Sequence, residues 1–117
     1  MEVTIPTNHT ECQSVLGSIG DALYVIGGKW KLPILHSICN GNIRFKDIEE
    51  SIPGLSNRML SRNLKELEEN KLITRVMSDE TLFYEYHFTE YSKEYGDLML
   101  KMIEWGKSHR KKLIQST

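Results

Sequence analysis

A short segment in the middle of the chain gathers side chains that could bind a nucleic acid. Its polar residues include Ser56, Asn57, Arg58, Ser61, Arg62 and Lys65. Arginine, lysine, serine and asparagine supply the hydrogen-bond donors and acceptors that pair with base edges and phosphate oxygens. We therefore expect this segment to contact double-stranded DNA, provided that these side chains share one exposed face.

The spacing of leucines predicts that this segment is a helix with such a face. Ser56 is a favourable N-cap, and the helix should continue to about Asn70. At 100° per residue, Leu64 and Leu67 fall within about 40° of Leu60 and define a narrow core face. The three cations fall between about 140° and 200° from Leu60, so they should project away from the core.

The order of charges along this helix is the reverse of the one that would stabilise it most, which favours a functional reason for it. Its cations lie in the N-terminal half, whereas Glu66, Glu68 and Glu69 lie in the C-terminal half. The helix dipole favours the opposite order by about 0.3–1 kcal/mol for each charge, but acids in the first half would repel phosphate. The alternative is a solvated helix stabilised by ion pairs one turn apart. Those pairs would be Arg62–Glu66 and Lys65–Glu69.

The elements that must position this helix can be predicted from hydrophobic spacing and from turn residues. Helices are expected over residues 14–26, 30–39, 44–51, 56–70 and from 89 onward, and strands over 73–77 and 83–88. The polar run between the two strands is typical of a hairpin. Two short helices followed by a hairpin predict a mainly α fold with a small β-hairpin, a winged helix-turn-helix with flanking helices at both ends.

Length and composition restrict the class of protein. The chain has 117 residues, of which 39% are hydrophobic and 26% charged, as expected for one globular domain. Residues 1–11 lack periodicity and are expected to form a flexible arm, with residues 12–117 forming the domain. No apolar run approaches the roughly 18 residues of a membrane span, and the N-terminus does not resemble a signal peptide. We expect a cytoplasmic protein with no membrane partner.

The net charge of −1 conceals an uneven distribution of charge. Residues 29–65 carry seven cations and three acids, whereas residues 66–97 carry three cations and nine acids. The first of these blocks could form an anion-binding patch. The backbone N–H groups at the start of the helix expected over residues 30–39 would favour phosphate. The candidates for contact with the DNA backbone are Lys29, Lys31, Arg44 and Arg75.

Three short motifs lie in register between residues 27 and 60. They are GGKWK at 27–31, RFKDI at 44–48 and PGLSNRML at 53–60. These motifs resemble the HxlR family of bacterial transcription regulators, within the MarR-like winged-helix group, and the likeness covers about residues 12–107. The resemblance implies a dimer that binds specific DNA sites, with the fourth helix in the major groove and the hairpin as a wing. The wing tip departs from the family because Asp79 and Glu80 stand where a cation is usual, so Arg75 is the better phosphate contact.

The helices at the two ends carry more apolar surface than a small winged helix can cover. The surplus residues are Val15, Leu16, Ile19 and Leu23 in the first helix, and Leu98, Met99, Met102 and Trp105 in the last. Pairing of two copies about a twofold axis would cover both stripes and would match DNA sites one helical turn apart. We predict a homodimer on a palindromic operator; packing of both stripes within one domain is the alternative.

Two cysteines raise the question of redox or metal chemistry. Cys12 is a candidate redox thiol because a helix N-terminus lowers a thiol pKa, and the resemblance includes sensors of oxidants and electrophiles. Cys39 is expected in the core. The pairs His9–Cys12 and His36–Cys39 have a zinc-compatible spacing, but no carboxylate is placed to orient the imidazoles. We expect no metal and no cofactor, with an oxidant, an electrophile or another small molecule as the candidate effector.

The sequence carries no recognisable catalytic motif. No Ser-His-Asp order, glycine-rich phosphate loop or pair of carboxylates stands out, so we do not expect an enzyme. The alternative function is a winged-helix protein-interaction module whose basic helix binds an acidic partner. A steep salt dependence of duplex binding would separate DNA binding from that alternative.

Overall fold

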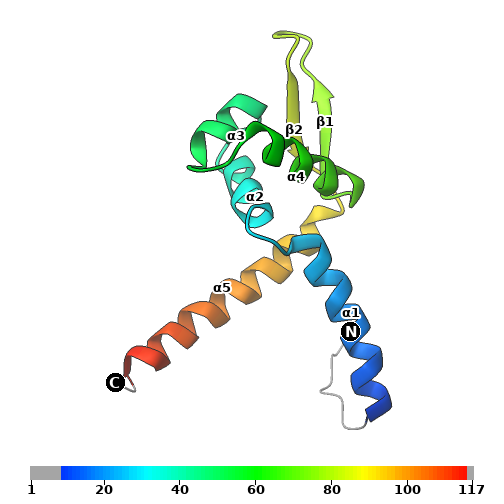
Figure 1. Ribbon diagram of the computed structural model, residues 1–117, viewed down its shortest axis with the longest axis vertical. Coiled ribbons are helices and arrows are strands. Elements are labelled where there is room, and N and C mark those ends of the chain that lie inside the picture. The colour runs from blue at the N-terminus through cyan, green and yellow to red at the C-terminus, as the bar shows by residue number, and fades with distance from the viewer. Residues whose placement is uncertain (1–8, 116–117) are drawn as a thin grey trace.

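The computed structural model describes residues 9–115, and its elements follow the predicted order (Figure 1). The helices are α1 (His9–Ile26), α2 (Lys31–Cys39), α3 (Phe45–Ser51), α4 (Asn57–Glu69) and α5 (Ser92–Gln115), and the strands are β1 (Ile73–Met77) and β2 (Tyr84–Phe88). The two strands form one antiparallel hairpin. The prediction of a mainly α fold with a small β-hairpin is thus confirmed.

Helix α1 begins earlier than its hydrophobic spacing predicted, at His9 and not at Ser14. Residues 9–11 of the expected arm are therefore helical, and residues 1–8 lie outside the described part of the chain. The boundary was missed because apolar periodicity marks only the amphipathic part of a helix, and the polar first turn of α1 carries no such signal. Within residues 9–115, no helix combines the length and the hydrophobicity that crossing a membrane requires.

The hydrophobic core lies where α2, α3 and α4 meet the base of the hairpin. Ile34 of α2, Ile48 of α3 and Leu60 of α4 are fully buried. Strand β1 adds Ile73, and β2 adds Tyr86. Because each buried aliphatic side chain contributes about 1.5–3 kcal/mol, this core fixes the leucine face of α4 inward and leaves the opposite face to solvent.

A tight turn sets the direction in which α4 leaves α3. Gly54 has a φ of 84°, a left-handed conformation that glycine adopts without steric cost. A Cβ atom added there would lie 3.7 Å from the ring of Trp30, which therefore packs over the turn. Ser56 then caps α4, because its hydroxyl oxygen accepts a hydrogen bond from the Met59 N–H at 3.2 Å.

The hairpin is attached at its base and projects beyond α4 at its tip (Figure 1). In the strand register Arg75 lies opposite Tyr86. The Tyr86 N–H donates a hydrogen bond of 2.7 Å to the Ile43 carbonyl oxygen, which ties β2 to the loop before α3. At the base of the hairpin Thr89 lies in the turn before α5, and its hydroxyl oxygen accepts a hydrogen bond of 3.2 Å from the N–H of Ser92, the first residue of α5.

Helices α1 and α5 extend away from the core on the side opposite the hairpin (Figure 1). Among side chains 15–26 of α1 only Ile26 is buried, and within α5 only Ser92 is buried. Seven of the eight predicted stripe residues are exposed in the single chain, and the eighth, Met99, is half-buried. The domain therefore leaves both stripes largely uncovered.

Candidate nucleic-acid interface

Helix α4 carries its cations on the face opposite its three leucines. The leucines are buried, whereas Arg58, Arg62 and Lys65 are exposed. Ser61 is exposed on the same helix. The face therefore offers two guanidinium groups, an ammonium group and a hydroxyl to a ligand outside the protein, and these are groups that bind base edges and phosphates.

The first turn of α4 is less available than its residue types suggest. The hydroxyl oxygen of Ser56 is used for the N-cap described above. The Asn57 amide faces the Glu49 carboxylate of α3, to which its nitrogen can donate a hydrogen bond. Both residues remain exposed, but each side chain already has a partner within the protein. The two arginines, Ser61 and Lys65 are therefore the principal members of the candidate surface.

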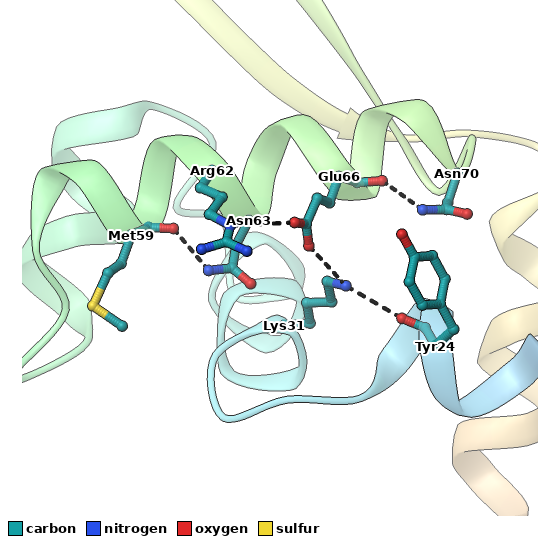
Figure 2. Close-up of polar contacts among 7 residues, drawn as sticks. All are labelled: Tyr24, Lys31, Met59, Arg62, Asn63, Glu66 and Asn70. Atoms are coloured by element: carbon teal, nitrogen blue, oxygen red, sulfur yellow. Dashed lines mark hydrogen bonds and ion pairs between the residues drawn. The ribbon is translucent and has the colours of Figure 1, made fainter. Parts of the chain in front are cut away.

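Of the two ion pairs expected for a purely solvated helix, the structure contains the one between Arg62 and Glu66 (Figure 2). Its Nε atom lies 3.4 Å from Oε1 of Glu66, and its side chain is 81% exposed. Within the part of the chain that the structure describes, Lys65 forms no ion pair with Glu69. An exposed pair one turn apart contributes about 0.3–0.5 kcal/mol, so a DNA contact can displace it. Arg62 therefore stays a candidate.

Lys31 does not belong to the exposed surface, contrary to the expectation that it contacts the DNA backbone. Its side chain is only 8% exposed, and its Nζ atom lies 3.0 Å from Oε2 of Glu66. The same ammonium donates a hydrogen bond of 3.3 Å to the Tyr24 carbonyl oxygen (Figure 2). A buried ammonium needs such partners because an unpaired charge is costly to desolvate. The hydrogen bond from Lys31 holds the pKa of Glu66 below its ordinary value, and Arg62 acts in the same direction.

The other three cations expected at the DNA backbone lie beside aromatic rings. The charged groups lie 4.9 Å from the ring centre for Lys29 with Trp30, 5.1 Å for Arg44 with Phe83 and 4.4 Å for Arg75 with Tyr84. Cation–π contacts of this kind restrict where the charge can lie. Phe83 and Tyr84 thus help to position two arginines, Arg44 before α3 and Arg75 within β1. Sequence reasoning missed this role, because aromatic residues in a strand signal only a β-compatible pattern.

Lys29 provides a direct test of a backbone contact. Replacing Lys29 with alanine should weaken binding to all duplexes by a similar factor, because phosphates carry no sequence information. The slope of log affinity against log salt should become shallower by about one unit, since one fewer counterion is released. Fluorescence anisotropy with two unrelated duplexes at several salt concentrations measures both quantities. A loss confined to one duplex, with an unchanged slope, would contradict the assignment.

A groove between α2 and α5 corrects the expectation for Cys39. This residue is exposed and does not belong to the core. It lines a cavity of about 600 Å³ together with Leu35, Phe88, Met99 and Ile103. Cys39 is open to this cavity because α5 diverges from α2 and does not cover its last turn (Figure 1). The side chains of His9 and Cys12 lie outside the described residues.

The three-helix core, the hairpin and the basic outer face of α4 together define a winged helix-turn-helix of the nucleic-acid-binding class. Residues 25–113 match the HxlR-like helix-turn-helix family, and the chain belongs to this family. It is thus a MarR-like winged-helix protein of transcription regulation, and DNA binding is the activity that the family implies.

Relatives and solved structures agree with this assignment. An HTH-type transcriptional regulator from Methanothermobacter thermautotrophicus is 39% identical over 80% of this chain and 72% of its own length. The structure of a MarR-family transcriptional regulator from Enterococcus faecalis is 27% identical, with a TM-score of 0.77 over 86% of this chain and 92% of that one. The redox regulator HypR in its reduced form is 33% identical, with a TM-score of 0.70 over 86% and 99% of the two chains.

Proposed function

We propose that this protein regulates transcription by binding a specific site in double-stranded DNA through α4. The observation that carries the proposal is the exposed face of α4, where two arginines and a lysine lie opposite three buried leucines. In this arrangement α4 enters the major groove, which accepts a helix and presents a distinct pattern for each base pair. Lys29, Arg44 and Arg75 bind phosphates on either side.

The test is to select duplexes from a random pool with the full-length protein and to titrate them over a range of salt concentrations. Specific DNA binding should enrich a sequence, should discriminate it from a scrambled duplex and should weaken steeply with salt because counterions are released. The alternative, a module that binds an acidic protein partner, would enrich no sequence.

We further propose that the protein binds its DNA as a homodimer. The apolar residues of α1 and α5 support this, because Leu16 and Trp105 are each 67% exposed in the single chain. The apolar surface of α5 continues through Met99 into the groove beside α2. A continuous row of exposed apolar side chains is typical of a protein–protein interface. A twofold axis would make the two α4 helices equivalent on a palindromic site about one helical turn apart.

Regulation by an oxidant or an electrophile is a second proposal, which the similarity to the redox regulator HypR supports. The sequence predicts that Cys12 is a redox thiol because it lies near the start of the first helix. Cys39 is a second thiol, which is exposed in the groove. If Cys12 is the sensor, hydrogen peroxide should lower the affinity of the parent and of Cys39→Ser for the selected duplex. The affinity of Cys12→Ser should not change. Equal sensitivity of all three proteins would exclude Cys12.

A further inference from the structure

Glu66 on α4 has a cation at each of its two carboxylate oxygens (Figure 2). Lys31 approaches Oε2 and Arg62 approaches Oε1. The two cations lie in different environments, since Lys31 is buried beneath α4 and the Arg62 side chain extends into solvent. One carboxylate thus connects an arginine of the candidate DNA surface to an ammonium inside the protein.

Lys31 also connects α4 to the end of α1. Its Nζ atom donates a hydrogen bond to the Tyr24 carbonyl oxygen and lies 5.4 Å from the centre of the Tyr24 ring. Tyr24 belongs to the last turn of α1, the helix whose apolar stripe is uncovered in the single chain. The ammonium of Lys31 is therefore a polar link between a flanking helix and the helix proposed to enter the major groove.

We propose that Lys31 is a positioning residue for DNA binding, which neutralises Glu66 and so leaves Arg62 available to the DNA. This proposal rests on the proposed function. A carboxylate that is already paired with a buried ammonium holds an exposed arginine only weakly, and such surface pairs are easily exchanged. Arg62 can then form a charge-assisted hydrogen bond with a base or a phosphate.

Loss of Lys31 would reverse this arrangement. Arg62 would become the only cation paired with Glu66 among residues 9–115. The attraction between the two would increase, because the carboxylate would no longer be compensated from inside the protein. The same uncompensated charge would lie on the helix that approaches the phosphates. Both effects would weaken DNA binding without any direct contact between Lys31 and DNA.

The test compares Lys31→Met, Glu66→Gln and the double variant on a duplex that the parent protein has selected from a random pool. Lys31→Met should bind this duplex at least about fivefold more weakly, the lower end of typical couplings between sites. In the double variant binding should return to within about twofold of the parent, because a neutral amide neither retains Arg62 nor repels phosphate. All titrations are made well below the melting temperature of each variant, because Glu66→Gln also removes the unpaired carboxylate that Lys31→Met leaves and can restore stability as well as binding.

Each outcome decides for or against the proposal. It is overturned if Lys31→Met stays folded and binds as tightly as the parent, or if the double variant binds as weakly as Lys31→Met. Should Lys31→Met fail to fold, Glu66→Gln alone decides, because the proposal requires it to bind at least as tightly as the parent. If the parent enriches no duplex, the proposed function fails and this proposal fails with it. If the parent enriches a duplex but Arg62→Ala binds it like the parent, only the role of Arg62 and this proposal fail.

Discussion

Replacing Arg58 and Arg62 together with alanine should remove most of the specific DNA binding and leave the protein folded. Each arginine that forms a bidentate contact with guanine contributes about 1–3 kcal/mol of discrimination, so the double variant should lose roughly fivefold to 150-fold for each such contact. Both side chains are exposed, and exposed substitutions usually change the free energy of unfolding by less than about 0.5 kcal/mol.

The measurement is a titration of the selected and the scrambled duplex, together with a thermal melting curve. Arg110→Ala is the matched control, because it removes an exposed arginine from α5, outside the candidate surface. We expect the control to bind like the parent at moderate salt. If the double variant remains folded and binds the selected duplex as tightly as the parent, α4 is not the helix that recognises DNA.

Introducing a charge into the apolar stripe of α5 should dissociate the dimer. The two half-sites would then no longer be bound together by one dimer. Met102 is exposed in the single chain, so Met102→Asp should be tolerated by the fold of the monomer. At a buried interface, however, the carboxylate would be desolvated without a partner. Linking two binding modules increases affinity by roughly 10²–10⁴, so dissociation should lower the affinity for the palindromic duplex by about that factor.

Sedimentation velocity and DNA titration at the same protein concentration test this prediction. Lys107→Asp is the control, because it places a carboxylate on the same helix at about 140° around the axis from Met102. The control should remain dimeric. A parent protein that sediments as a monomer, or a Met102→Asp protein that sediments as a dimer, would contradict the proposed interface.

Local pattern alone determined the form of the candidate DNA surface. A helix fixes the angle between successive side chains, so the positions of three leucines already required Arg58, Arg62 and Lys65 to point away from the core. Capping is equally local, and the structure has Ser56 as the N-cap of α4. The five-residue strand β1 coincides with the predicted range for the same reason, since its β-compatible run is bounded by turn residues.

Tertiary structure alone decided which residues near this surface are accessible. Lys29 and Lys31 are two positions apart and look alike in the sequence, but only Lys31 lies beneath α4, where it meets Glu66 from 35 positions away. Cys39 stands in an apolar helix and was expected in the core, but α5 diverges from α2 and leaves it exposed. Periodicity specifies the face of a helix on which a side chain lies, whereas burial depends on which distant element covers that face.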